Sequence, residues 1–394
     1  MKKKLFIVFF MLLLTTGCWS KKDLNELAIV TAIGIDKTDD GYSVSIQVLN
    51  PSELAGNTRS GRTEVVRFIK TGETIFETLR KLSTDSPRRI YLAHLREVVF
   101  GEELAKDGIG KALDFISRDH EMRTDFYITV AKGSTAADIL NVQTAIEKVP
   151  ANKLFNSLEN SENVWAATKT VQLDELINSI VSKGKEPVLT GIYSYGNSEY
   201  GSNIENVHNV SPETGLRLDY LAVFKKDKLI GWLNMDESKG FNYVTDTIKN
   251  TVVTIETDDG KVSIETLRSK TKVRGKMNKG KPVIDITIDT EGNLADVESS
   301  IDLSKPENVD KLEKEYQNNI KEKVQSSIKK VQEEFQSDIF GFGEVIHRAD
   351  PKAWKGIEDN WDEMFTNLDI NVEVKAEIRR LGTITESFQK ETKE

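Results

Sequence analysis

The chain has 394 residues, of which 54 are Lys or Arg and 63 are Asp or Glu, so its formal net charge at pH 7 is −9. Its hydrophobic content of 38% is too low for a polytopic membrane protein and too high for a wholly disordered chain, and its length suits two or three globular domains of roughly 150 residues each. The acidic balance argues against a nucleic-acid partner, since duplex binders carry a basic excess, and the single cysteine excludes an internal disulfide.

The first eighteen residues have the pattern of an export signal. Three lysines at positions 2–4 precede ten apolar residues at 5–14, which are too few to span a bilayer but suit a secretory signal. The only cysteine, Cys18, follows Gly17 and resembles the lipidated cysteine of a bacterial lipobox. We predict a lipoprotein signal peptide over residues 1–17 and lipidation at Cys18; the alternative is a buried thiol. Losing residues 1–17, three of them lysine, leaves 377 residues with a formal charge of −12.

Residues 18–195 are expected to form an N-terminal α/β region of one or two subdomains, the second near residues 150–195. An Asp-Gly turn signal at residues 37–41 lies between two runs of strand character and predicts a hairpin. Further on, apolar residues recur at helical and strand spacing in turn, and Ser134 is expected to cap a helix. The expected strands are 27–35, 42–49, 88–101, 125–131 and 187–195, and the expected helices are 73–82, 102–117 and 151–185.

A Gly/Asn/Ser-rich stretch without periodicity, residues 196–215, is expected to be a linker. Residues 216–394 are then expected to form a C-terminal α+β domain, in which alternating apolar and polar residues predict an antiparallel sheet with one solvent-exposed face. Trp354 and Trp361 lie on one face of a closing helix and suit either core packing or an interface anchor. The expected elements are strands at 219–224, 229–233, 251–256, 262–274, 283–289 and 370–378, and a helix at 351–365.

The clearest helix is predicted over residues 305–339. Its apolar residues recur every three or four positions, and Ser304 with Glu307 predicts a capping box at its start. Two interpretations stay open, a helix laid across the sheet and a helix that binds a partner. Gly341 and Gly343 are expected to mark a helix stop with a turn.

Signatures of catalysis, cofactor binding and metal binding are missing from the sequence. The four histidines are scattered, there is no Walker sequence and no Gly-x-Ser-x-Gly elbow, and 63 carboxylates single out no acid/base pair. We therefore predict no catalytic residue, no cofactor and no metal, and a protein that is not an enzyme. One segment, residues 87–96 (PRRIYLAHLR), is basic and aromatic in an acidic chain. It suits either a site for an anion or acidic partner, or a solvated strand edge.

Six stretches together resemble a known family. They are Gly17-Cys18-Trp19, residues 24–30 (LNELAIV), residues 33–37 (IGIDK), residues 86–96 (SPRRIYLAHLR), residues 340–344 (FGFGE) and residues 359–363 (DNWDE). In this order, and across nearly the whole mature chain, they resemble the Ger(x)C family, the lipoprotein C subunits of spore germinant receptors.

The resemblance implies a spore-forming bacterium, a lipid on Cys18 and a place on the outer face of the spore inner membrane. It implies a mixed α+β fold of about three domains. It also implies two partners, a membrane-spanning A subunit and a transporter-like B subunit, with which the C subunit triggers germination in response to nutrients. The family marks no catalytic residues, and its ligand recognition is generally assigned to the membrane subunits.

Two other functions stay open from the sequence. The two-region layout and the many carboxylates would also suit a membrane-tethered, extracytoplasmic solute-binding protein or hydrolase. A structural component of the spore coat is the third interpretation, and it predicts a protein that is found outside the membrane fraction.

Overall fold

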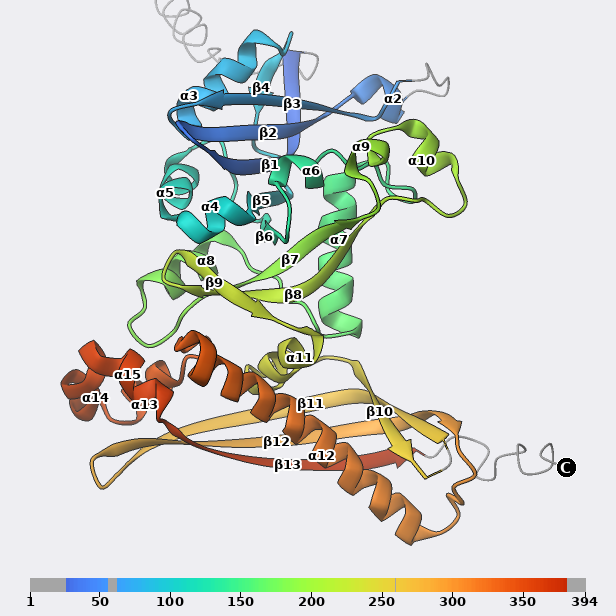
Figure 1. Cartoon of the computed structure of the whole chain (residues 1–394), viewed down its shortest axis with the longest axis vertical. Helices are drawn as coiled ribbons and strands as arrows, with labels where there is room; N and C mark the ends of the chain where they lie inside the picture. The colour runs from blue at the N-terminus through green and yellow to red at the C-terminus, as the bar shows by residue number, and fades with distance from the viewer. Residues whose placement is uncertain (1–25, 56–61, 259, 381–394) are drawn as a thin grey trace, which may run out of the picture.

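The computed structural model describes residues 26–55, 62–258 and 260–380, and the predicted signal peptide lies outside these ranges. In this part of the chain the strands form two mixed sheets on which helices pack, which confirms the predicted α+β class. Figure 1 shows an elongated molecule with a larger sheet in its upper part, a smaller sheet in its lower part, and helix α11 (Met235–Val244) between them.

The larger sheet has nine strands within the described ranges, in the order β3-β2-β1-β5-β6-β7-β8-β9, with β4 beside β1. The strands are β1 (Leu27–Thr38), β2 (Gly41–Leu49), β3 (Val65–Gly72), β4 (Arg89–Tyr91), β5 (Glu97–Gly101), β6 (Tyr127–Ala131), β7 (Val188–Tyr195), β8 (Gly215–Lys225) and β9 (Lys228–Leu233). Strands β1 and β2 form the predicted hairpin. Strands β1, β5, β6 and β7 run parallel, so their carboxyl ends lie at one edge of the sheet.

Helices cover both faces of the larger sheet. They are α2 (Pro51–Ala55), α3 (Ile75–Lys81), α4 (Glu102–Asp107), α5 (Gly110–Arg118), α6 (Ala136–Ile139), α7 (Pro150–Val164), α8 (Leu173–Val181), α9 (Ser198–Gly201) and α10 (Ile204–His208). Apolar residues of α3, α4, α5 and α8 join one core, and those of α6 and α7 join a second. Ile33 belongs to the first core and its neighbour Ala32 to the second, because successive side chains of a strand point to opposite faces.

The smaller sheet carries the long helix. Its strands are β10 (Thr251–Thr257), β11 (Gly260–Asn278), β12 (Lys281–Glu298) and β13 (Asp369–Arg380). The first three are antiparallel as predicted, whereas β13 runs parallel to β12. Helix α12 (Pro306–Lys330) crosses this sheet, and α13 (Phe342–Ala349), α14 (Pro351–Ile357) and α15 (Trp361–Thr366) gather at one end of it (Figure 1). Trp354 and Trp361 are buried, which confirms the core-packing interpretation for both.

The long helix packs as a core element but is shorter than predicted. Its apolar stripe is buried in the core that it shares with the smaller sheet: Leu312, Tyr316, Ile320, Val324 and Ile328. The predicted long helix is confirmed, but it ends before residue 339: α12 continues into a π-helical turn at Val331–Phe335, and the left-handed Gln336 (φ 50°) ends the helix. The predicted capping box is wrong, since Ser304 Oγ donates to Asp302 Oδ1 at 2.6 Å and Lys305 is the N-cap. The apolar spacing continues past the helix because the turn that follows is buried too.

The predicted linker at residues 196–215 lies inside the larger sheet instead of between two separate sheets. Strand β7 before it pairs with β8 after it, with Val188 opposite Val223 and Tyr195 opposite Gly215. The segment forms the connection between these neighbouring strands and contains α9 and α10. Its composition indicates a loop correctly, but whether the two flanking strands pair depends on long-range contacts that local composition does not encode.

Two neighbouring elements predicted as continuous are each broken in the structure. The strand predicted at 88–101 is two strands, β4 and β5, which pair with different parts of β1 and are separated by residues 92–96. The helix predicted at 102–117 is α4 and α5, because Gly108 takes a φ of 130° that ends the first helix. In both places buried apolar residues continue through the break, so periodicity alone predicts a single element.

Two further predicted helices are also broken. The helix predicted at 151–185 is α7 and α8, separated by residues 165–172, where Ala166 takes a left-handed φ of 57°. The helix predicted at 351–365 is α14 and α15, separated by a 3-10 turn at Glu358–Asn360.

Two helix ends differ from the predictions. Thr135, one residue after the predicted Ser134, is the N-cap of α6 and forms a capping box with Asp138. Gly341 does not mark a helix stop: with a φ of 76° it is the N-cap of α13, which begins at Phe342. The glycine does provide the predicted turn, but the turn leads into the next helix.

Candidate functional site

The motif stretches of the sequence lie at two places in the fold. Residues 340–344 and 359–363 lie between the two sheets, a region that we call the joint. Residues 86–96 lie beside the start of β1, and we call this segment the basic end. The nominated lipidation residue, Cys18, lies outside the described residues.

In the joint, one buried carboxylate ties the two C-terminal motifs together. Asp338 accepts hydrogen bonds from the backbone N–H groups of Gly341 at 2.9 Å, Phe342 at 3.1 Å and Gly343 at 2.8 Å. It also accepts one from Nε1 of Trp361 at 2.9 Å. These bonds satisfy free N–H groups at the start of α13 and hold the tryptophan against it. The motif residues here therefore have a structural role.

Two glycines allow the backbones on the two sides of the joint to touch. A Cβ atom at Gly343 would lie 2.6 Å from Cα of Gly184, which precedes β7 in the larger sheet, so the two backbones touch because both residues lack side chains. The Glu344 N–H donates to the Gly184 carbonyl at 3.3 Å, and the Glu186 N–H donates to the Asp338 carbonyl at 2.8 Å. Direct backbone contacts thus connect the larger sheet to the turn before α13.

Helix α11 makes a second set of polar contacts across the joint. Nδ2 of the buried Asn242 donates to the carbonyls of Ala166 at 2.9 Å and Thr168 at 3.0 Å, in the segment that follows α7. Oγ1 of Thr247 donates to Oδ1 of Asn242 at 3.0 Å and so fixes the orientation of the amide.

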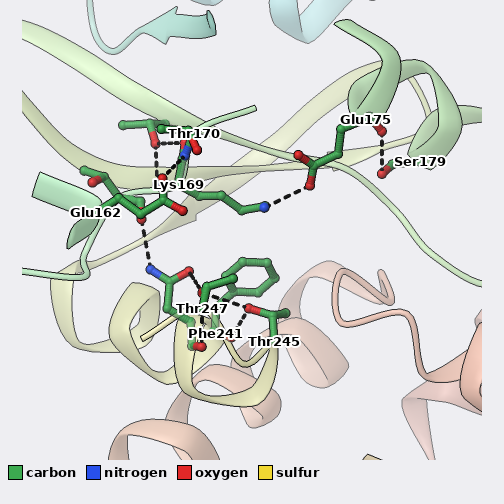
Figure 2. Close-up of polar contacts among 11 residues, drawn as sticks. Glu162, Lys169, Thr170, Glu175, Ser179, Phe241, Thr245 and Thr247 are labelled. Atoms are coloured by element: carbon green, nitrogen blue, oxygen red, sulfur yellow. Dashed lines mark hydrogen bonds and ion pairs between the residues drawn. The ribbon is translucent and has the colours of Figure 1, made fainter. Parts of the chain in front are cut away.

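The surroundings of this amide are themselves held by polar contacts. Figure 2 shows Thr247 on the α11 side and, opposite it, the Lys169–Glu175 ion pair and the Thr170 N–H bonded to Glu162. The ion pair measures 2.8 Å, and the Thr170 bond measures 3.0 Å.

Apolar packing is continuous through the joint. Val188, Leu221 and Val223 of the larger sheet share one core with Phe241 of α11 and with the smaller sheet and its helices. A shared core of this kind resists independent movement of the two sheets, because separating them would expose buried apolar surface to water. The joint is therefore a fixed connection between the two halves of the molecule.

The basic end is the other place where a motif lies, and it is exposed. Strand β4 pairs in parallel with the first residues of β1, with Leu27 opposite Arg89 and Ile29 opposite Tyr91. Arg88 and Arg89 are exposed. Figure 1 shows β4 at the upper end of the molecule, opposite to the smaller sheet.

Charge at the basic end is only partly neutralised. Arg89 forms an ion pair with Glu121, and Arg123 forms one with Asp125 at 2.9 Å. Among the described residues, Arg88 and Arg96 have no carboxylate within ion-pair distance. The segment is thus an edge strand, as one of the two sequence interpretations holds. It also leaves cationic groups free for an anion, as the other interpretation requires.

A hollow of about 400 Å³ opens beside this segment. It is lined by Ile29, Thr31, Leu49, Ala93, His94, Leu95, Arg96, Arg123, Asp125 and Asn152. The Arg96 guanidinium lies 5.1 Å from the centroid of the Phe155 ring, and that ring stacks on Tyr127 at 4.4 Å. A cation over an aromatic face is attracted by the ring quadrupole, so Arg96 is held in place without a carboxylate partner.

Beneath Arg96, Glu97 is a fully buried acid. Thr129 Oγ1 donates to Glu97 Oε1 at 2.6 Å, while Glu97 Oε2 has no hydrogen-bond partner. Burial raises the pKa of Glu97 to about 8, against a smaller lowering by the Thr129 hydroxyl, because the charged form is poorly solvated there. At pH 7 Glu97 is therefore mostly neutral and does not cancel the positive charge of the basic end.

Sequence reasoning missed Glu97, Asn242 and Asp338. Asp338 had a usable signal, since an aspartate three residues before a glycine can cap the turn that follows. Glu97 and Asn242 had none, because their importance comes from burial by distant segments. Across the described ranges, no three His, Cys, Asp or Glu side chains are grouped to hold a metal ion. Nor is any helix in those ranges long and apolar enough to cross a membrane.

Comparison with known proteins places the chain in a family. Residues 20–193 match the model of the spore germination protein N-terminal domain, and residues 219–382 match the model described as spore germination B3/GerAC-like, C-terminal. The chain belongs to the GerAC-like family of spore germination proteins. The segment between β7 and β8 separates the two matched regions. Because these two strands pair, the larger sheet contains residues of both regions.

Relatives of this GerAC-like chain match over nearly its full length. Spore germination protein KC of Bacillus subtilis (strain 168) is 33% identical, with 97% of both chains covered. Spore germination protein B3 of the same organism is 27% identical, with 97% of this chain and 98% of the relative covered. The crystal structure of the GerBC protein matches with a TM-score of 0.54 at 20% identity, over 88% of this chain and 96% of that one, which shows a shared fold.

Proposed function

We propose that this chain is a non-enzymatic, lipid-anchored C subunit of a nutrient germinant receptor. It is anchored through Cys18 on the outer face of the spore inner membrane and docks to the membrane-spanning A and B subunits. Membership of the GerAC-like family supports the receptor role, and the lipobox-like sequence that ends at Cys18 supports the anchor.

One observation carries the choice of docking surface. The basic end pairs with Leu27, and only eight residues lie between Leu27 and Cys18. Even fully extended, the nine Cα-to-Cα steps from Cys18 to Leu27 span no more than about 32 Å, so a lipid on Cys18 keeps Leu27, beside which the basic end lies, within that distance of the membrane surface. The exposed, unpaired Arg88 and Arg96 then face lipid headgroups and the extracytoplasmic parts of the membrane subunits. The basic end is therefore the docking surface in this proposal.

The anchor is tested with Cys18→Ala. Because the chain has one cysteine, incorporation of labelled lipid reports on Cys18 alone. The proposal predicts that the wild-type chain is labelled and found with the membrane fraction, and that the variant is unlabelled, unprocessed by lipoprotein signal peptidase and defective in germination. Equal labelling or processing of the variant would rule out the anchor.

The receptor role is tested separately by deleting the chain in a spore former that lacks paralogues. The proposal predicts loss of the response to at least one nutrient, with the response to a non-nutrient trigger retained. Normal germination with every nutrient would contradict the receptor role even if the anchor were established.

A further inference from the structure

A second hollow, separate from the basic end, lies at the carboxyl ends of the parallel strands. Its volume is about 440 Å³, and its walls include Glu102, Lys132, Tyr193, Tyr220 and Trp232. Glu102 follows β5, Lys132 follows β6, and Tyr193 lies in the last part of β7. In open sheets with parallel strands, this edge is where ligands generally bind, because the loops there converge on one space. The volume is in the range of small-molecule sites.

The backbone of β8 is distorted where it forms one wall of this hollow. Between the pairs Thr190–Leu221 and Ile192–Leu218, strand β8 has two residues, Asp219 and Tyr220, opposite the single Gly191. In this bulge Tyr220 takes a φ of 67°, a left-handed conformation that normally goes to glycine. A bulky residue in a left-handed conformation is a strained feature of the kind that clusters at binding sites. The bulge aims the Tyr220 ring at Tyr193, whose centroid is 6.4 Å away.

The floor of the hollow depends on a glycine. A Cβ atom at Gly191 would lie 2.6 Å from the Trp232 ring, so the indole rests directly on the backbone of β7. Tyr193, Tyr220 and Trp232 are each partly exposed, which leaves their surfaces accessible to a ligand. Together they form an aromatic lining contributed by three adjacent strands.

Lys132 is the free cation of this hollow. Its Nζ lies 4.0 Å from the Tyr220 ring centroid and 5.7 Å from the Trp232 centroid. Within the described part of the chain, no carboxylate lies within ion-pair distance of it. The charge of Glu102 is already compensated, since it pairs with Lys106 at 3.2 Å and accepts a hydrogen bond from the Gly133 N–H. The hollow therefore presents one uncompensated ammonium surrounded by aromatic rings.

We propose that this hollow binds a small monocarboxylate with a flat, apolar body. The carboxylate takes the hydrogen bonds that the Lys132 ammonium offers, and the apolar body stacks on the rings of Tyr193, Tyr220 and Trp232. The hollow offers one uncompensated ammonium, so the second charge of a dicarboxylate would have no cationic partner there and a dicarboxylate is a poorer ligand. A free organic acid and the α-carboxylate of a peptide that ends in an aromatic residue share this chemistry.

The test measures benzoate binding to the full chain, purified in detergent, by calorimetry and ligand-observed NMR. Benzamide, which has the same shape without the charge, is the matched ligand control. Lys132→Gln removes the cation, Lys132→Arg keeps it, and Lys228→Gln removes an exposed lysine of the same sheet outside the hollow. A pentapeptide of four glycines and a C-terminal phenylalanine, compared with its C-terminal amide, distinguishes the peptide source from the free acid.

The proposal predicts that benzoate or the free-acid peptide binds and that benzamide and the peptide amide do not. Lys132→Gln should weaken binding roughly tenfold to a hundredfold, since a charge-assisted hydrogen bond is lost, while Lys132→Arg and Lys228→Gln should keep it. Binding that is tighter for the peptide than for benzoate assigns the site to a protein terminus, and the reverse assigns it to a free acid. No binding by the wild-type chain, equal binding of benzamide, or unchanged binding by Lys132→Gln would overturn the proposal.

Discussion

Glu97→Gln tests the structure beneath the basic end most sharply. The substitution keeps the shape of the side chain and its acceptor for Thr129 Oγ1, but it removes the ionisable group. Burial raises the pKa of Glu97 from 4.5 to about 8. The folded chain therefore holds this proton more tightly than the unfolded chain does, and the stabilisation is fully present below pH 4.5. It is lost as the pH rises from 4.5 to 8, because only the unfolded state can ionise freely in that window.

The size of this stabilisation follows from the rise in the pKa of Glu97. A difference of one pKa unit corresponds to about 1.4 kcal/mol, so a rise from 4.5 to about 8 corresponds to about 5 kcal/mol in total. We expect Glu97→Gln and wild type to unfold with similar free energies at pH 5. Above pH 5, the free energy of unfolding of the variant should rise relative to that of wild type by about 1 kcal/mol for each pH unit up to pH 8.

The assay is urea unfolding of both proteins at pH 5, 6, 7 and 8, with the slope of free energy against urea checked for constancy. Glu103→Gln, at an exposed carboxylate, is the matched control and should show no such trend. If the difference in unfolding free energy between Glu97→Gln and wild type stays constant from pH 5 to pH 8, the pKa of Glu97 is not raised by burial, because Glu97 is then ionised in the folded protein.

Three substitutions test the joint and the strained strand. Asn242→Ala should destabilise the protein by about 2–4 kcal/mol in urea unfolding, because the buried Ala166 and Thr168 carbonyls lose their donor, whereas Asn209→Ala at an exposed position should change little. Gly343→Ala should lower the free energy of unfolding by about 1–3 kcal/mol, because the added methyl group meets the backbone of Gly184. Gly356→Ala in α14, where open space surrounds the glycine, should be neutral or stabilising. Equal effects of the two substitutions would contradict the close packing at Gly343. Tyr220→Gly should lower the free energy of unfolding less than Tyr193→Gly does, because glycine relieves about 1–2 kcal/mol of left-handed backbone strain and so offsets the lost ring contacts. A larger loss at Tyr220 would argue against backbone strain there.

Local patterns in the sequence predicted the elements that local forces determine. The hairpin of β1 and β2 follows from its Asp-Gly turn, and the buried stripe of α12 follows from apolar spacing. The alternation of Ile284, Ile286 and Ile288 predicted a strand with one buried face, and all three are buried. The pairing of β7 with β8 was not predictable in this way, because strand partners are chosen by contacts between distant residues.

The candidate site was predictable only in part. The basic end is visible in the sequence because three of its residues are arginines in an acidic chain, Arg88, Arg89 and Arg96. Its place beside the start of β1 comes from the parallel pairing with β4. Glu97 follows the same segment directly, but its neutral state depends on burial by strands on both sides of β5. Charge patterning therefore finds the exposed part of the site and misses its buried support.

The most direct test of the proposed docking is photo-crosslinking in spores from single positions in this chain. A benzoylphenylalanine residue replaces Arg88 at the basic end or, as the control, Lys279 in the turn between β11 and β12, in the half of the molecule that holds the smaller sheet (Figure 1). If the basic end docks to the membrane subunits, crosslinks to them form from position 88 and none form from position 279. Crosslinks from position 279 with none from position 88 would contradict this docking, because the docking surface would then be the opposite end of the molecule.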